Sequence, residues 1–244
     1  MDRAIFITAR TSSSRLPGKC LLEVCPGITA IEFLINRLSN KGYLLFLCTS
    51  TSPADDTLAG LVKNTAKATV FRGSEDDKLK RWIDCAEMYN IEFFVTADGD
   101  DLLVDPELIN MAFEQYRNHW HGFINCPNTP SGSFSWGIET KSLKRIYSKH
   151  ATANANTEMG WAWFDDVHEL ENIPSELIRK DVRMTLDYED DLEFFRKTIG
   201  SIGDASLRDI LKFLDSNRHI ADININREDD WKSNQKKLVS KLGE

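Results

Sequence analysis

The first hundred residues alternate short apolar runs with segments of helical periodicity, and this alternation restricts the possible folds more than any other feature. The apolar, strand-favouring runs cover residues 4–8, 44–49, 68–71 and 92–97. Apolar residues recur at helical spacing in residues 31–38, 79–90 and 109–116. Strands that alternate with helices form right-handed βαβ units. We therefore predict a three-layer α/β fold with a mostly parallel, mixed sheet covered by helices on both faces.

The rest of the chain adds further elements. Asp105 and Pro106 are typical of a helix start, with the aspartate as N-cap and the proline at the first helical position. Residues 182–187, VRMTLD, favour a strand, and helical segments follow it. Residues 126–165 are rich in Pro, Gly, Ser, Asn and Trp. This composition indicates long functional loops or a β-ribbon flap, which would lie on the side of the site that binds the acceptor. We expect one domain over residues 1–230, followed by a polar C-terminal tail or helix over residues 231–244.

The composition indicates which classes of binding partner are not expected. The 244 residues include 30 Lys and Arg against 38 Asp and Glu, for a net charge of -8, so we expect no general attraction to nucleic acid or to anionic membranes. The apolar runs are far shorter than the ~20 residues that a membrane helix needs, and the N-terminus reads as a strand rather than a signal peptide. Five scattered cysteines lack zinc-site spacing. A cytoplasmic protein is expected.

The segment after the first apolar run, ARTSSSRLPGK, gathers cations, hydroxyl groups and a glycine, which are the groups that bind a phosphate chain. They are Arg10, Ser12, Ser13, Arg15, Gly18 and Lys19. The spacing differs from a P-loop, because no glycine stands five residues before Gly18 and a cysteine follows Lys19. On charge alone, a solvated basic loop is an equally good interpretation. Ligands of parallel sheets bind beyond the carboxyl ends of the strands, which places this segment in a crevice.

Carboxylates cluster at two predicted strand ends. Asp98, Asp100 and Asp101 surround a glycine after the fourth apolar run, and Asp187 ends the predicted strand at residues 182–187. Crowded carboxylates are costly unless a cation neutralises them, and Mg²⁺ prefers such ligands. The alternative for the first cluster is a turn with helix-capping aspartates. The cationic loop and the two carboxylate clusters together indicate a site for a metal-bound nucleoside triphosphate.

Four motifs carry a resemblance to a known family. ARTSSSRLPGKCLLEV resembles the A-R-x-x-S-x-R-L-P-G-K signature of the cytidylyltransferases that make CMP-activated sugars, in particular the spore-coat polysaccharide protein F type. VFRGSEDDKLKRW, GDDLLVDPELI and RMTLDYEDDLEF continue the likeness in the same order. The resemblance implies a glycosyltransferase-A-like nucleotidyltransferase fold. The implied activity is transfer of CMP from CTP to an acidic sugar of the nonulosonic or octulosonic type, or a related acceptor, with release of pyrophosphate, in surface polysaccharide synthesis.

The resemblance also implies roles for individual residues. Arg10, Arg15 and Lys19 would hold the triphosphate, and Asp100 and Asp187 would bind Mg²⁺. Catalysis would then rest on Arg15, Lys19 and Asp100. The full set of nucleotide-binding candidates is Ala9, Arg10, Ser12, Arg15, Gly18, Lys19, Arg72 and Gly73, the last two because they end the third apolar run.

The acceptor half departs from the family pattern. The motif around residue 158 keeps Glu158 but lacks the family's histidine, and PSGSFSWGIET has lost acidic residues. Trp136 and Trp161, with Glu158, are candidates for acceptor binding. The same tryptophans and Trp163 fit a homodimer interface equally well. Three alternatives therefore stay open: a nucleotide-binding homologue without chemistry that acts as a regulatory or assembly partner, transfer of another nucleotide, and transfer to a phosphate or phosphonate acceptor.

Overall fold

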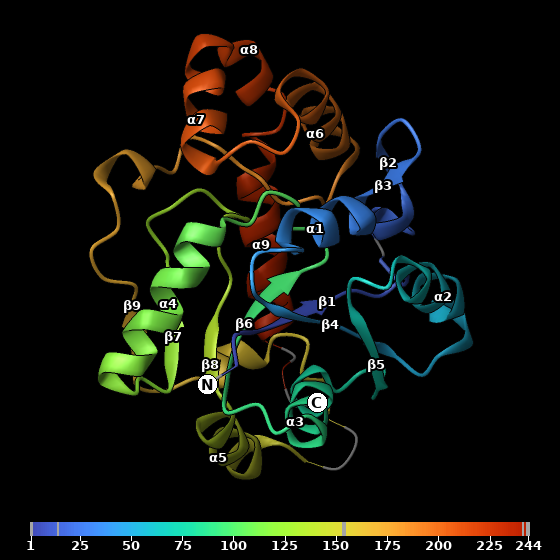
Figure 1. Cartoon of the computed structure of the whole chain (residues 1–244), viewed down its shortest axis with the longest axis vertical. Coiled ribbons are helices and arrows are strands. Elements are labelled where there is room, and N and C mark those ends of the chain that lie inside the picture. The colour runs from blue at the N-terminus through green and yellow to red at the C-terminus, as the bar shows by residue number, and fades with distance from the viewer. Residues whose placement is uncertain (1, 14, 153–154, 241, 243–244) are drawn as a thin grey trace.

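The computed structural model describes residues 2–13, 15–152, 155–240 and 242, and its centre is a seven-stranded mixed sheet (Figure 1). Its strands are β1 Ala4–Thr8, β4 Leu44–Ser50, β5 Thr69–Gly73, β6 Phe93–Asp98, β7 Phe123–Asn125, β8 Gly137–Glu139 and β9 Val167–Glu169. A separate two-stranded ribbon pairs β2 Glu23–Cys25 with β3 Ile28–Thr29. The α-helices are α1 Ala30–Leu38, α2 Asp56–Thr65, α3 Lys78–Met88, α4 Pro106–His119, α5 Thr140–His150, α6 Glu189–Ile202, α7 Leu207–Ser216, α8 Arg218–Ala221 and α9 Arg227–Val239.

The strand order is β5-β4-β1-β6-β8-β7-β9. The first four of these strands are parallel, whereas β8 runs antiparallel to both β6 and β7. Every residue of β1 is buried, as expected for a central strand with helices on both faces. All four apolar runs of the first hundred residues form strands of this sheet, which confirms the predicted α/β fold.

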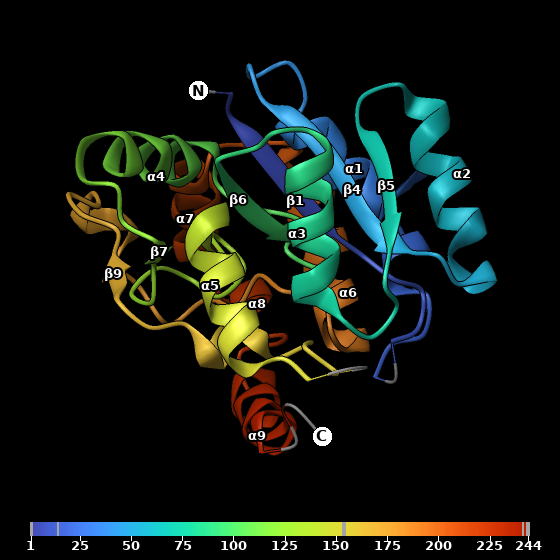
Figure 2. The same ribbon diagram turned by 90° about the horizontal axis from the view of Figure 1, so that it is seen from below.

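Two hydrophobic clusters cover the two faces of the sheet. Ile5 and Ile7 of β1 pack in a cluster with residues of α1, α2, α4, α6 and α7. Ala4 and Phe6, which point to the other face, pack with residues of α3 and α5. Figure 2 shows α3 and α5 together in front of the sheet. The three predicted helical faces correspond to α1, α3 and α4, and Asp105 caps α4 by accepting hydrogen bonds from the N–H groups of the first turn.

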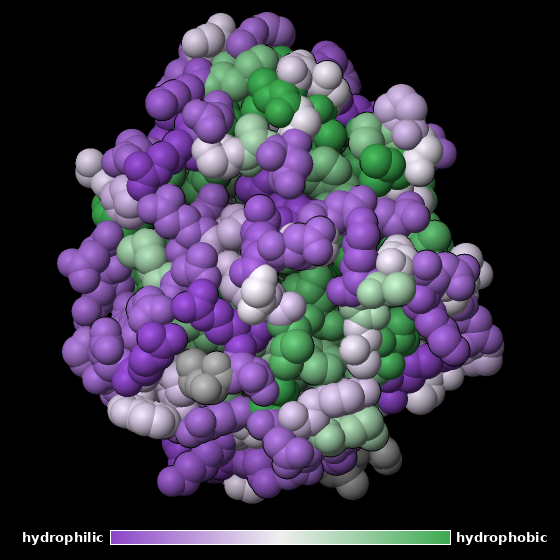
Figure 3. Space-filling view, in the orientation of Figure 1, coloured by the Kyte–Doolittle hydropathy of each residue, from purple (hydrophilic) through white to green (hydrophobic). Residues whose placement is uncertain are grey.

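The surface seen in Figure 3 is mostly hydrophilic, with smaller hydrophobic areas near β4 and β5 and around α6 and α7. Among the described residues, none of the helices combines the length and the apolar character that crossing a bilayer requires.

Two predictions about local structure need correction. Residues 182–187 form no strand, since only an isolated bridge joins Arg183 to Ser131. The N–H groups of Met184 and Leu186 instead donate to the carbonyls of Ser131 and Asp100, both at 2.8 Å. The predicted loop or flap contains the helix α5. For residues 231–244, where a polar tail or a helix was predicted, the structure has the helix α9, which begins at Arg227 and ends at Val239.

The carboxyl ends of β1 and β6 approach each other closely at Gly99. Its N–H donates to the carbonyl of Thr8 at 2.7 Å. A Cβ at position 99 would lie 2.6 Å from the Cβ of Ala9, well inside van der Waals contact. Glycine is therefore required for the two strand ends to meet, and this junction positions the loop after β1 against the carboxylates after β6.

We expect Gly99→Ala to destabilise the protein by about 1–3 kcal/mol, because the extra methyl group forces the two strand ends apart. Urea unfolding followed by circular dichroism would measure the change. Gly60→Ala is the matched control: position 60 lies in α2 with no atom within 4 Å of the added Cβ, so this variant should be as stable as the wild type or slightly more so. Equal stability of the two variants would contradict the steric argument.

Candidate active site

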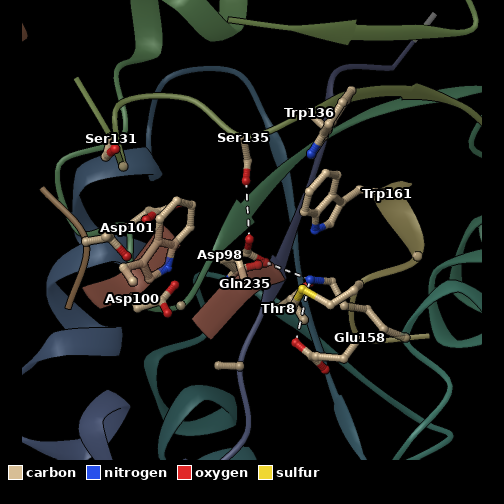
Figure 4. A pocket seen from close by; sticks show the side chains of 18 of the residues that line it. Thr8, Asp98, Asp100, Asp101, Ser131, Ser135, Trp136, Glu158, Trp161 and Gln235 are labelled. Carbon is tan, nitrogen blue, oxygen red and sulfur yellow. Dashed lines mark hydrogen bonds and ion pairs between the residues drawn. The ribbon is translucent and has the colours of Figure 1, made fainter. Parts of the chain in front are cut away.

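A cavity of about 510 Å³ opens at the carboxyl ends of β1 and β6. Its lining comes from the loop after β1, the start of α3, the turn after β6, residues 125–136, residues 157–161 and one face of α9. Figure 4 shows Asp98 in the middle of this cavity, with Asp100 and Asp101 on one side and Trp136 and Trp161 on the other. The cavity lies where parallel α/β sheets bind their ligands.

The loop after β1 has a fixed backbone. The Thr11 N–H donates to Oδ1 of the buried Asp55 at 2.7 Å, and the Gly18 N–H donates to the Thr11 carbonyl at 3.2 Å. Gly18 has a φ of 65°, a left-handed conformation that suits glycine, and it turns the loop into a short 3₁₀ helix that begins at Lys19. The backbone therefore holds Lys19 at the cavity.

Lys19 joins two of the predicted metal ligands. Its Nζ contacts Oδ2 of Asp100 and lies 2.8 Å from Oδ1 of Asp187, although the two carboxylates are 87 positions apart in the sequence. Arg15 also donates to Oδ1 of Asp187. Among the described residues, no three His, Cys, Asp or Glu side chains are grouped to hold a metal ion. In this structure an ammonium group occupies the place between the two carboxylates.

The two carboxylates differ in their pKa values although they share Lys19. Burial would raise the pKa of Asp187, but Lys19 and Arg15 outweigh it and lower this pKa to about 2. At Asp100, burial dominates, Lys19 offsets it only in part, and the charges of Asp187 and Asp98 add to it, so the pKa is raised. Asp101 has its pKa raised further, by burial and by the charges of Asp100 and Asp98. The turn after β6 thus holds two buried carboxyl groups whose charged forms are disfavoured.

Arg183 holds Asp187 from the other side. It is fully buried, and its Nη2 donates to Oδ2 of Asp187 at 3.0 Å. The same guanidinium donates from Nε to Asp191 and from Nη1 to Glu228 of α9, each at 3.0 Å. One arginine therefore ties together the segment that precedes α6, the first turn of α6 and the start of α9.

Arg10 belongs to a second group of charges in the same cavity. Its Nη1 donates to the Glu75 carbonyl at 2.6 Å and its Nη2 to Oε2 of Glu158 at 2.7 Å. The buried Lys78 places its Nζ 3.7 Å from Oε1 of Glu158 and 3.5 Å from Oδ1 of Asp98. Burial would raise the pKa of Glu158, but Lys78 and Arg10 lower it. The three cations predicted to hold the triphosphate thus lie in two groups: Arg15 and Lys19 contact Asp187, and Arg10 contacts Glu158.

The remaining nucleotide-binding candidates lie in two different places in the structure. Ala9 and Ser12 line the cavity. Arg72 and Gly73 lie outside that lining: β5 is the edge strand of the sheet, and the Arg72 guanidinium donates to the carbonyls of Ser50 and Ser52 and to Asp56. Their contact with the nucleotide stays a prediction. Their position gives them a structural role at the sheet edge.

Of the three tryptophans considered for the acceptor side or an interface, two line the cavity and one does not. Trp136 and Trp161 line the cavity, and Trp161 is 36% exposed. Trp163 lies outside the lining and stacks on His150, with ring centroids 5.5 Å apart. Trp136 and Trp161 thus line the same cavity as the loop after β1, and their contact with an acceptor stays a prediction.

The lining residues that the sequence did not indicate include Lys78, Trp231, Gln235 and Leu238. Lys78 stands in a KLKRW segment that reads as an ordinary amphipathic helix. The other three lie on α9 at spacings of four and three residues, which is one face of a helix. That spacing is the signal in the sequence, but the polar composition of the segment obscures it.

The sequence profile of the cytidylyltransferase family matches residues 4–198. The chain belongs to the cytidylyltransferase family. This confirms the resemblance carried by the sequence motifs, and it makes the cavity the candidate active site of a nucleotidyltransferase. The matched residues include the loop after β1, the turn after β6 and Asp187, whereas α9 lies beyond them.

Similar proteins span nearly the whole chain. An uncharacterized protein of Methanocaldococcus jannaschii is 28% identical over 231 residues, covering 91% of this chain and 93% of that protein. Spore coat polysaccharide biosynthesis protein SpsF of Bacillus subtilis is 25% identical, covering 88% of this chain and 95% of the relative. A cytidylyltransferase structure from Leptospira borgpetersenii has a TM-score of 0.76 at 23% identity, covering 91% of this chain and 97% of that one. At that identity the structural likeness supports the fold.

We expect Arg183→Ala to lower the free energy of unfolding by about 3–5 kcal/mol, because it leaves three carboxylates without their shared buried cation. Arg179→Ala is the control, since Arg179 pairs with Asp181 and Asp215, whose side chains are 49% and 53% exposed, and exposed pairs contribute about 0–1 kcal/mol. Urea unfolding of both variants would measure the difference. A loss at position 183 no larger than at position 179 would rule out the proposed burial effect.

Proposed function

We propose that this protein is a Mg²⁺-dependent cytidylyltransferase that transfers CMP from CTP to an acidic sugar-type acceptor and releases pyrophosphate, in the synthesis of a surface polysaccharide or glycoconjugate. The observation that carries the proposal is the contact of one Lys19 ammonium with both Asp100 and Asp187, beside Arg15. This group combines the cations that a triphosphate needs with the carboxylates that a divalent cation needs.

The residues fit a divalent cation. Asp100 and Asp187 already hold one cationic group between them, so their oxygens converge on a single position. The pKa values of Asp100 and Asp101 are raised first by burial and then by the charges of neighbouring aspartates. A divalent cation bound there would offset both effects. Asp100 and Asp187 would hold Mg²⁺, with Lys19 released toward the phosphates. When bound, the ion would neutralise charge on the phosphoryl oxygens.

The chain's own residues have definable roles in such a transfer. The acceptor oxygen attacks the α-phosphorus in line with the departing pyrophosphate, so catalysis is mostly positioning and charge neutralisation. Arg15 and Lys19, held by the fixed loop after β1, would bind the phosphate oxygens and neutralise the leaving group. Arg183 would keep Asp187 in place without touching a substrate, because it is fully buried.

Lys78, a cation apart from Arg15 and Lys19, supports the proposal of an acidic acceptor. Lys78 lies at the start of α3 and lines the cavity, with its ammonium group buried between Asp98 and Glu158. Its pKa is raised, because Asp98 and Glu158 outweigh the effect of burial. A carboxylate of the acceptor would meet a charged ammonium there. The similarity to spore coat polysaccharide biosynthesis protein SpsF is in keeping with a sugar-type acceptor.

Pyrophosphate release tests the proposal directly. The purified protein would be incubated with Mg²⁺, each of the four nucleoside triphosphates in turn, and a panel of nonulosonic and octulosonic acids. We expect release with CTP and at least one sugar acid, and a CMP-sugar product by mass spectrometry. Release with another nucleotide, or CTP binding without turnover on any acid, would refute the assignment.

Lys19→Ala and Asp100→Asn should each reduce kcat/KM for CTP by about 10²–10³, the usual effect of removing one charge-neutralising group. Lys41→Ala is the matched control, because Lys41 is exposed and lies outside the cavity lining. Steady-state pyrophosphate release would measure all three variants, and circular dichroism would verify that they fold. Turnover of Lys19→Ala at the Lys41→Ala rate would remove Lys19 from the mechanism.

Chelation of divalent cations should abolish turnover, and Mg²⁺ should restore it. Calorimetry would supply a second readout: CTP should bind more weakly in EDTA than with Mg²⁺, and Asp187→Asn should reduce that difference, because it removes one carboxylate ligand. Full activity in EDTA would overturn the metal dependence while leaving the nucleotide assignment intact.

A further inference from the structure

The helix α9 closes part of the cavity with side chains that no part of the nucleotide site uses. Trp231, Gln235 and Leu238 line the cavity from one face of this helix. Figure 2 shows α9 beyond the ends of the strands, and Figure 4 labels Gln235 among the residues that line the cavity. The residues that match the family end at 198, before α9 begins.

A polar anchor holds α9 in this position. Glu228 accepts a hydrogen bond from Nη1 of Arg183 and another from Oγ of Ser131, both at 3.0 Å. None of the residues of α9, all of which the structure describes, is buried. The helix is thus seated by Glu228 rather than by a hydrophobic core, and through Arg183 this anchor reaches Asp187.

The cavity face of α9 is uncharged and partly apolar. The Arg183 guanidinium lies 5.8 Å from the centroid of the Trp231 ring, which orients the indole. Leu238 is 38% exposed at the cavity, and Gln235 adds an amide that both donates and accepts hydrogen bonds. The cations of the cavity lie elsewhere, on the loop after β1 and on α3. This face therefore suits a neutral, hydroxyl-bearing group and offers no cation to phosphates.

We propose that α9 is the acceptor-recognition wall of the enzyme, with Trp231 packing against the C–H face of the acceptor and Gln235 hydrogen-bonding its hydroxyl groups. These two side chains are then specificity-determining residues for the acceptor, and the acceptor's carboxylate points away from them toward Lys78. The inference rests on the proposed function, because it assumes that a polyhydroxylated acid enters the cavity with CTP.

The test compares Trp231→Ala and Gln235→Ala with Lys236→Ala, an exposed position of the same helix that is absent from the cavity lining. The probe is the sugar acid of the nonulosonic and octulosonic panel that the wild type turns over fastest. We expect KM for this acid to rise about tenfold or more in the first two variants, as loss of one good contact predicts. KM for CTP should stay within about twofold of the wild type. Trp231→Phe, which retains an aromatic face, should recover part of the loss.

Each result decides the inference. A rise in acceptor KM alone supports it. Normal acceptor KM in both alanine variants, or an equal rise in KM for CTP, overturns it while pyrophosphate release by the wild type leaves the proposed function standing. No release by the wild type with any acid in the panel overturns the proposed function and the inference together. Thermal denaturation of all four variants would show whether a general loss of structure explains an effect.

Discussion

A single buried carboxylate, that of Asp187, requires the surrounding elements to meet. The side chain is 1% exposed, and a charge so buried is tolerable only with close cationic partners. Lys19, Arg15 and Arg183 supply them from two directions. Lys19 and Arg15 connect Asp187 to the loop after β1, and Arg183 connects it to α6 and α9. Much of the site's geometry follows from satisfying this one charge.

The parallel half of the fold was predictable from the sequence because burial leaves a pattern in it. The runs that became β1 and β6 are mostly apolar and almost entirely buried, as expected for strands covered on both faces. The helical faces of α1 and α4 repeat at helical spacing for the same reason. The cationic loop and the carboxylates at residues 98–101 were also predictable as neighbours, since the carboxyl ends of adjacent parallel strands lie together.

Other features depend on contacts that no local pattern reports. In residues 182–187, apolar side chains alternate as in a strand, yet the alternation reflects burial beside the turn after β6 and not strand pairing. Arg72 resembled a ligand-binding arginine because it ends a strand, but which strand lies at the sheet edge is a matter of topology. The place of α9 is set by Arg183 and Glu228, which are 45 positions apart. Its own sequence is too polar to predict a buried contact.

The charges that line the cavity explain why nucleotide and metal would enter together. Among the described lining residues, the cations Arg10, Arg15, Lys19 and Lys78 face the carboxylates Asp98, Asp100, Asp101 and Glu158, four of each sign. A triphosphate alone would compete with these carboxylates for the cations, and a divalent cation alone would be repelled by the lysines. Under the proposed function, the phosphates would contact Lys19 and Arg15 while the metal would contact the carboxylates, so these groups would exchange one partner for another. The ion pairs of the cavity would in this way favour the metal-nucleotide complex over either component.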